Sequence, residues 1–253
     1  MPWFEHGTSR INYEESGSGD PVLLLPGFSD TIAGHTLLRE TLRPHYRVIA
    51  ADLPGSGRSQ PQPRQYAAGY FDDDARSFIA LLQKVAGRPT HLVGFSDGGD
   101  DALLMAALAP EMARSVLTWG AAGVVSDPSG QLREAMFNVV DRPIPPMEQY
   151  REHLVATYGE ANARAMTQSF ATALGAIIEA GGDISRSKVG AITCPVLLIA
   201  GEHDMFVSKA LLDELAGHIP TAETIEVEGV GHDVHNARPE WFVQTALDWL
   251  MRY

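Results

Sequence analysis

One serine of the chain has the surroundings of a catalytic nucleophile. Residues 94–98 read Gly-Phe-Ser-Asp-Gly and fit the G-x-S-x-G pattern, with Ser96 at the centre. The pattern needs a strand before it and a helix after it, and the apolar runs at 91–93 and 102–108 predict that order. A serine on such a sharp turn presents its hydroxyl away from the sheet, where it can attack a carbonyl carbon. Without that context the pentapeptide is as typical of an ordinary turn as of a catalytic serine.

A serine nucleophile needs a base that takes its proton and a carboxylate that orients the base. The apolar run at 196–200 predicts a buried strand, and Glu202 and Asp204 follow it. Either carboxylate can accept the Nδ1–H of a histidine. The alternative for each is a solvated loop residue or a cap on the next helix.

The glycine-rich turn after the predicted strand at 223–227 supplies the candidate base. His232 lies on this turn, where its ring can swing over the serine as general base and then general acid. His235 lies three residues further and is the alternative. The pair His232-x-x-His235 lacks the helical H-E-x-x-H form of a zinc site, so we predict no metal here.

Two backbone N–H groups are candidates for stabilising a developing oxyanion. The Asp97 N–H follows the nucleophile at the start of a helix, and the Phe28 N–H belongs to a glycine turn after the predicted strand at 22–25. The carboxyl ends of parallel strands lie at one edge of a sheet, so these donors are expected to meet the serine there. A plain strand-ending turn is the alternative for Phe28.

Strands and helices alternate along most of the chain, which predicts an α/β protein with a doubly wound, mostly parallel sheet. The pattern changes at 124–189, where two helical stretches are predicted at 147–158 and 160–180. We therefore expect one core, formed by 1–123 and 190–253, with 124–189 inserted as a helical cap.

No cofactor is predicted. The Gly/Pro-rich loop at 52–59 matches neither the G-x-x-x-x-G-K-[ST] nor the G-x-G-x-x-G form of a phosphate-binding loop. The acidic run at 72–74 lies near the start of a helix predicted over 66–86, where negative charge favours the helix dipole. We interpret that run as a solvated helix start and not as a metal site.

Composition restricts the partners of the chain. Its 253 residues carry a formal net charge of −13, which argues against binding to nucleic acid or to an anionic membrane. The single cysteine, Cys194, excludes a disulfide within one chain and is interpreted as a buried thiol. Neither a signal peptide nor an apolar stretch of the roughly 18 residues of a membrane span is visible. We expect a cytoplasmic monomer or small homo-oligomer.

At these motifs the chain resembles the α/β-hydrolase superfamily over nearly its whole length. The matching stretches are 25–28, 52–59, 94–99, 201–204, 231–232 and 238–242. The resemblance implies an eight-stranded, mostly parallel sheet flanked by helices, with Ser, Asp and His in that chain order. It also implies Asp204 over Glu202 as the acid and His232 over His235 as the base.

The elbow, with Asp97 after the nucleophile, is similar to that of the valacyclovir-hydrolase (biphenyl-hydrolase-like) group. In that group the corresponding acid is implicated in recognising the α-amino group of amino-acid esters, so the resemblance implies this role for Asp97. The alternative is that Asp97 only favours the helix N-terminus. The chain departs from the family in the Leu-Pro-Gly-Phe end of its first parallel strand and in the acids Asp100 and Asp101. These acids are expected to favour the helix start or to add negative potential near the site.

We predict a serine hydrolase that cleaves ester-type bonds of a small molecule through an acyl-enzyme. A C–C bond hydrolase, a lactonase or a perhydrolase would use the same triad, and a ligand receptor is the non-enzymatic alternative. A dehalogenase or epoxide hydrolase is disfavoured, because those relatives carry Asp where Ser96 stands.

Apolar side chains near the insertion are candidates for a substrate pocket beside Phe28 and Asp97, with core packing as the alternative. They are Trp119, Met136, Phe137, Met147 and Phe170.

Overall fold

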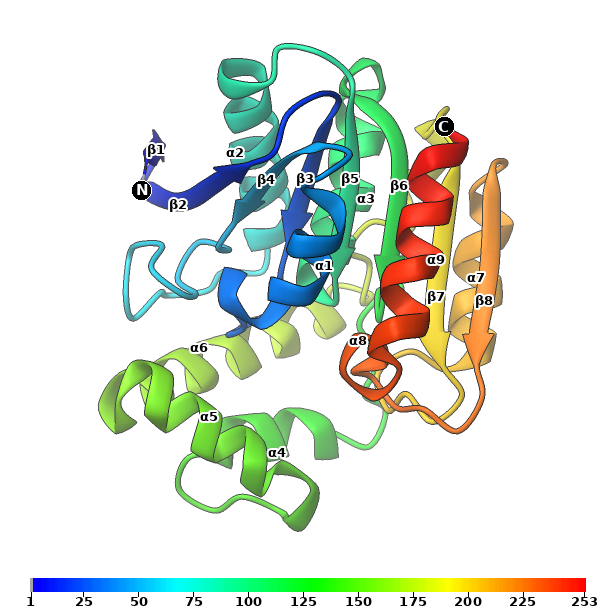
Figure 1. The fold of residues 1–253 in the computed structure, drawn as a ribbon. Coiled ribbons are helices and arrows are strands. Elements are labelled where there is room, and N and C mark those ends of the chain that lie inside the picture. The colour runs from blue at the N-terminus through cyan, green and yellow to red at the C-terminus, as the bar shows by residue number, and fades with distance from the viewer. Residues whose placement is uncertain (1) are drawn as a thin grey trace.

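A computed structural model describes residues 2–253 and contains one eight-stranded sheet with helices on both faces (Figure 1). The strand order is β1-β2-β4-β3-β5-β6-β7-β8. The pairs β1–β2 and β2–β4 are antiparallel, and the other pairs are parallel. The predicted fold class is therefore confirmed. The strands are β1 Trp3–His6, β2 Ser9–Ser16, β3 Pro21–Leu25, β4 Arg47–Ala51, β5 Thr90–Phe95, β6 Ala113–Trp119, β7 Val196–Gly201 and β8 Ala222–Val227.

The central strands are mostly apolar because helices cover both faces of the sheet. Every residue of β3, β5 and β7 is buried. Helices α1 and α9 pack on one face, and α2, α3 and α7 pack on the other (Figure 1). These helices are α1 Thr36–Leu42, α2 Tyr70–Val85, α3 Asp97–Leu108, α7 Lys209–His218 and α9 Pro239–Arg252.

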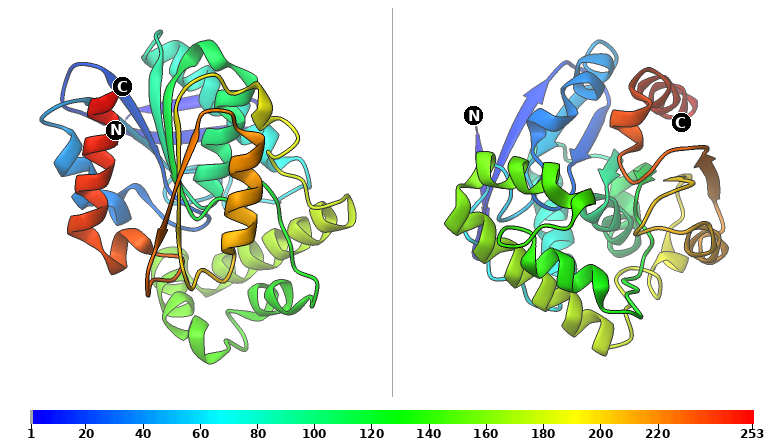
Figure 2. Two further views of the ribbon diagram at one scale, coloured as in Figure 1. Left: turned by 90° about the vertical axis from the view of Figure 1, so that its right-hand side faces the viewer. Right: turned by 90° about the horizontal axis from the view of Figure 1, so that it is seen from below.

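The segment 124–189 carries three helices that lie beyond the carboxyl ends of the strands (Figures 1 and 2). They are α4 Gln131–Asn138, α5 Glu148–Tyr158 and α6 Glu160–Glu179. The two ends of the segment are joined at its base, where the Val125 N–H donates to the Gly182 carbonyl at 2.7 Å. Helix α4 was not predicted, because its eight residues are too few to show a clear helical period.

The acidic run at 72–74 lies at the start of α2, where Asp72 and Asp73 are at least partly exposed, but the prediction of a solvated position is wrong for Asp74. Asp74 is buried and forms a bidentate ion pair with Arg64, at 2.6 and 2.7 Å. Asp72 pairs with Lys188 at 2.8 Å, at a half-exposed position. The difference arises because α2 begins only at Tyr70, and the irregular segment before it brings Arg64 onto the helix.

Residues 2–253 contain no helix with the combined length and apolar character needed to cross a bilayer.

Candidate active site

Ser96 lies on the tight turn between β5 and α3. Its backbone has φ 51° and ψ −120°, a conformation that non-glycine residues rarely adopt. The flanking glycines permit this turn, because a Cβ on Gly94 would lie 2.1 Å from the Gly98 carbonyl oxygen. A Cβ on Gly98 would lie 2.2 Å from the Pro26 oxygen. The strand, turn and helix therefore have the arrangement that the motif requires.

A chain of hydrogen bonds joins the three residues predicted as the triad. His232 Nε2 lies 3.1 Å from Ser96 Oγ, and His232 Nδ1 lies 2.9 Å from Asp204 Oδ2. A carboxylate can only accept, so Nδ1 carries the proton toward Asp204 and Nε2 is left to accept from the serine hydroxyl. This is the tautomer in which a histidine can act as a general base.

Asp204 is fixed by its own loop. Its Oδ1 accepts from the N–H groups of Phe206 at 2.8 Å and Val207 at 3.1 Å, and its side chain is fully buried. The competing candidate Glu202 instead accepts from the Gly229 N–H at 2.8 Å, at an exposed position. The geometry therefore brings Asp204, and not Glu202, to the histidine.

The ring of His232 occupies a space that a glycine leaves free. Gly120 follows β6 with φ +70°, and a Cβ there would lie 2.6 Å from His232 Cε1. Phe95 and Phe206 confine the ring, with centroid distances of 4.9 and 4.6 Å. Sequence reasoning missed Gly120, although a glycine directly after a predicted strand was a usable signal.

His235 takes no part in this chain of hydrogen bonds. The indole N–H of Trp119 donates to His235 Nδ1 at 3.0 Å, and the His235 ring stacks on His35 with centroids 4.9 Å apart. Burial lowers the pKa of His235 to about 3, so the ring stays neutral.

Two backbone amides lie beside the nucleophile. The Asp97 N–H is the first of α3, so the helix supplies no acceptor for it. Phe28 belongs to a turn closed by the Asp30 N–H and the Gly27 carbonyl at 3.1 Å. Within residues 2–253, no hydrogen bond from the Phe28 N–H is found. A Cβ on Gly27 would lie 3.1 Å from Ser96 Cβ, which shows how near this turn is to the nucleophile.

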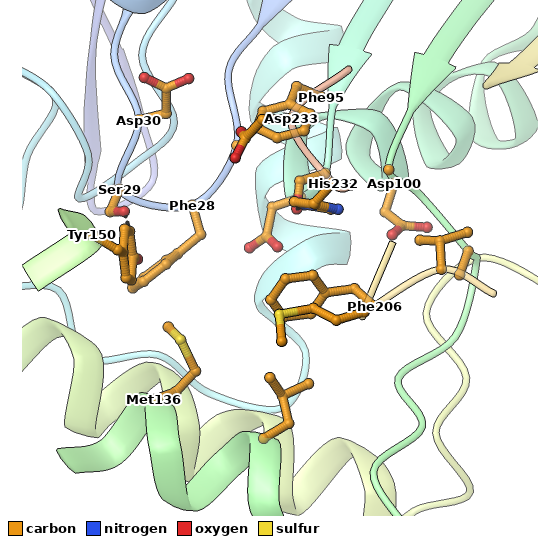
Figure 3. A pocket seen from close by; sticks show the side chains of 18 of the residues that line it. Phe28, Ser29, Asp30, Phe95, Asp100, Met136, Tyr150, Phe206, His232 and Asp233 are labelled. Atoms are coloured by element: carbon orange, nitrogen blue, oxygen red, sulfur yellow. Dashed lines mark hydrogen bonds between the residues drawn. The ribbon is translucent and has the colours of Figure 1, made fainter. Parts of the chain in front are cut away.

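A cavity of about 670 Å³ opens between the strand ends and the helices of 124–189 (Figure 3). The cavity is lined from the 124–189 segment by Met136, Met147 and Phe170, and from the core by Phe28. Two predicted pocket residues, Trp119 and Phe137, do not line the cavity. Trp119 is fully buried against Phe95 and Phe242, because β6 directs it to the α1 and α9 face of the sheet. Phe137 is 43% exposed on the outer side of α4.

Acidic side chains contribute much of the polar lining, and the lining within residues 2–253 includes no lysine or arginine. The acids are Asp30, Asp97, Asp100 and Asp233, three of which are labelled in Figure 3. Asp97 Oδ2 accepts from the Tyr70 hydroxyl at 2.8 Å. Burial raises the pKa of Asp97 to about 7, and that of Asp100 to about 7 as well.

Asp101 does not line the cavity and lies on the buried side of α3. Both of its carboxyl oxygens are buried, and neither has a hydrogen-bond partner in the described part of the chain. Burial raises the pKa of Asp101 well above its usual value, and the neighbouring Asp74 and Asp97 raise it further. The neutral form of this carboxyl is therefore favoured, which differs from the expected electrostatic support of the helix start.

One group of side chains in residues 2–253 has the donor set of a metal site, namely Asp30, His35 and His235. These atoms already bond within the protein. His35 Nε2 lies 2.8 Å from Asp30 Oδ2, and Trp119 occupies His235 Nδ1. The group braces the turn that carries Phe28.

Residues 22–245 match the model of the alpha/beta hydrolase family. Together with the sheet order and the position of the elbow, this match shows that the chain belongs to the alpha/beta hydrolase family. The predicted family and the predicted hydrolase class are therefore confirmed.

Individual relatives align with most of the chain. The chain is 28% identical to the serine hydrolase BPHL of Homo sapiens over 246 residues, which cover 95% of this chain and 83% of that protein. It is 24% identical to the 2-(acetamidomethylene)succinate hydrolase of Mesorhizobium japonicum over 258 residues, 92% of this chain and 89% of that one. The enol-lactonase structure from Burkholderia xenovorans superposes with a TM-score of 0.79 at 19% identity, over 99% of this chain and 100% of that chain, and shows the common fold.

Proposed function

We propose that the protein is a serine esterase whose triad is Ser96, His232 and Asp204. The observation that carries this proposal is the continuous chain of hydrogen bonds from Ser96 Oγ through His232 to Asp204, at the floor of the cavity. As Ser96 Oγ attacks the ester carbonyl, His232 Nε2 takes its proton and then gives it to the leaving alkoxide. A water molecule activated by His232 hydrolyses the acyl-enzyme.

The oxyanion of each tetrahedral intermediate is bound, in this proposal, by the N–H groups of Phe28 and Asp97. Both belong to rigid backbone beside Ser96, and neither has an acceptor from its own element. Donors that are already oriented need no reorganisation during the reaction, and one such donor is typically worth about 3 kcal/mol of transition-state stabilisation.

We further propose that 124–189 acts as a cap on a core formed by 1–123 and 190–253. Support comes from the closed base of this segment and from the side chains that α4 and α6 contribute to the cavity. A cap excludes water from the acyl pocket and sets its shape.

The substrate class that the cavity favours is a small ester with a cationic acyl group. Asp97 adjoins the nucleophile, and the acids around it have no lysine or arginine in the lining to neutralise them. An α-ammonium group can pair with Asp97 and hold the scissile carbonyl above Ser96. The similarity to BPHL and the motif shared with the valacyclovir-hydrolase group support the same substrate class.

The same lining disfavours the anionic substrates of other family members. The Mesorhizobium relative is named for a succinate, which is a dicarboxylate, and a C–C bond hydrolase of ring-cleavage products would also bind a carboxylate. The lining within residues 2–253 offers no lysine or arginine to hold the carboxylate of such a ligand, and the ionised carboxyl groups of the lining repel it. A lactonase or a perhydrolase would use the same triad as an esterase. A receptor differs from all of these enzymes, because it would show a single slow turnover of an activated ester.

The test is a panel of p-nitrophenyl esters with neutral and α-amino acyl groups. We expect multiple turnovers, a preference for α-amino esters, and loss of hydrolysis in Ser96→Ala with an unchanged circular dichroism spectrum. Undiminished hydrolysis in Ser96→Ala would overturn the triad. A single slow turnover in the wild type would indicate a receptor instead.

A further inference from the structure

Ser29 and Ser96 are the two non-glycine residues with positive φ in residues 2–253, and both adjoin the reacting centre. Ser96 is explained by the elbow. Ser29 has φ 61° at the third position of the turn that carries Phe28, where glycine or asparagine is usual. A strained residue of this kind persists only where its surroundings hold it in place.

All the polar groups of Ser29 are held by groups from two other segments. Its N–H donates to Ser56 Oγ at 3.1 Å, from the loop at 52–59. Its hydroxyl shares a hydrogen bond with the Tyr150 hydroxyl at 2.8 Å, and its carbonyl accepts from the Tyr158 hydroxyl at 2.8 Å. The Ser29 side chain is buried, so water does not compete for these bonds.

Both tyrosines belong to α5, two turns apart on the side of the helix that faces the core. Tyr158 also accepts from the Gly57 N–H at 2.8 Å, which ties the same hydroxyl to the 52–59 loop. Tyr150 lies directly against Ser29, with Phe28 beside it (Figure 3). Helix α5 is therefore hydrogen-bonded to Ser29, the residue that follows the proposed oxyanion donor Phe28.

We infer that Tyr150 and Tyr158 are positioning residues, which fix the Ser29 peptide and thereby aim the Phe28 N–H at the reacting carbonyl oxygen. This inference rests on the proposed oxyanion role of Phe28. It gives α5 a part in the chemical step in addition to shaping the pocket. A helix that moves away from the core would release Ser29 from its strained conformation and disorient the donor.

The test uses Tyr150→Phe and Tyr158→Phe, which remove a hydroxyl and keep the ring. Ser169→Ala is the matched control, because Ser169 Oγ on α6 accepts from the Tyr66 N–H at 2.8 Å and does not touch the turn. We expect kcat to fall about tenfold in each tyrosine variant with KM nearly unchanged. A misaimed donor should cost less than the 10²–10³-fold typical of a deleted one. The control should stay within about twofold of the wild type.

Two further measurements separate positioning from simple support of the fold. Phenylboronic acid forms a tetrahedral adduct with a catalytic serine, so its inhibition constant should rise in parallel with the loss of kcat. In a Ser29→Ala background, Tyr150→Phe should have no additional effect, because its partner is already absent.

The outcomes are distinguishable. Tyrosine variants that match Ser169→Ala, that raise only KM, or that leave boronate inhibition unchanged would overturn the positioning role while leaving the esterase intact. Additive losses in the Ser29→Ala background would do the same. If Tyr158→Phe fails to fold, Tyr150→Phe alone decides. A wild-type protein without Ser96-dependent hydrolysis would overturn the proposed function itself.

Discussion

The Asp204 loop and helix α3 both carry buried carboxyl groups near Ser96, and the hydrogen bonds that these groups receive differ. Asp204 has both oxygens occupied, by His232 and by two backbone N–H groups. On α3, Asp97 accepts one hydrogen bond from Tyr70, and Asp101 has none in the described chain. A carboxylate whose two oxygens are both hydrogen-bonded is fixed in orientation, which suits the positioning of a histidine. Asp97 lines the cavity and has one oxygen bonded by Tyr70, so its carboxyl group is open to a cationic ligand, whereas Asp101 does not line the cavity.

The largest effect should come from the fully bonded acid. Asp204→Asn should lower kcat by about 10⁴-fold, because the amide stabilises the wrong tautomer of His232. Glu202→Gln on the same loop is the matched control and should change kcat by less than about twofold, since Glu202 bonds only the Gly229 N–H. Steady-state kinetics with p-nitrophenyl acetate measure both. Equal losses in the two variants would remove the distinction between these carboxylates.

A smaller and selective effect is expected on α3. Asp97→Asn should lower kcat/KM for an α-amino ester by about 10- to 100-fold, the range of one charge-assisted hydrogen bond, and should leave neutral esters nearly unchanged. The comparison of both esters on both proteins is its own control. A loss that is equal for the two esters would assign Asp97 to the fold or to the oxyanion alone.

The pH dependence should separate the two regions further. Since burial raises the pKa of Asp97 to about 7, the carboxyl becomes ionised only as the pH rises through that value. For an ester with a permanently charged quaternary ammonium group, kcat/KM relative to a neutral ester should therefore rise between about pH 6 and pH 8. The ratio cancels any pH dependence that the two esters share. A ratio that is flat with pH, or unchanged in Asp97→Asn, would contradict this assignment.

The smallest effect concerns stability. The folded pKa of Asp101 is raised above its unfolded value of about 3.9, so the folded state keeps a proton that the unfolded state releases. This carboxyl therefore costs more stability as the pH rises from about 4 toward the folded pKa. Asp101→Asn should raise Tm by about 3 °C at pH 8 and by less at pH 5, measured by calorimetry. Asp213→Asn, at an exposed helix pair, is the control and should show little pH dependence.

The elbow turn, the positions of Ser96, Asp204 and His232 after their strands, and the alternation of strands and helices were predictable because each depends on local residue types. The direction of Trp119 was not. It pairs in register with Phe95, and both side chains point to the α1 and α9 face. The sequence of a strand that is buried on both faces does not reveal this direction.

The tertiary partners of polar residues also could not be predicted from the sequence. Arg64 meets Asp74 across an irregular segment, and Ser29 meets two tyrosines more than a hundred residues away. Nothing local distinguishes these residues from solvated ones. The acidic character of the cavity was visible as an unusual pair, Asp100 and Asp101, but only the fold shows that the first lines the cavity and the second does not.

The central claim is that Ser96 is a nucleophile activated by His232. It is tested most directly by intact-mass spectrometry after incubation with a p-nitrophenyl phosphonate ester, which phosphonylates an activated serine. We expect a single adduct that maps to Ser96, is absent from Ser96→Ala and forms much more slowly in His232→Ala. An adduct on another residue, or equal labelling of the wild type and His232→Ala, would contradict it.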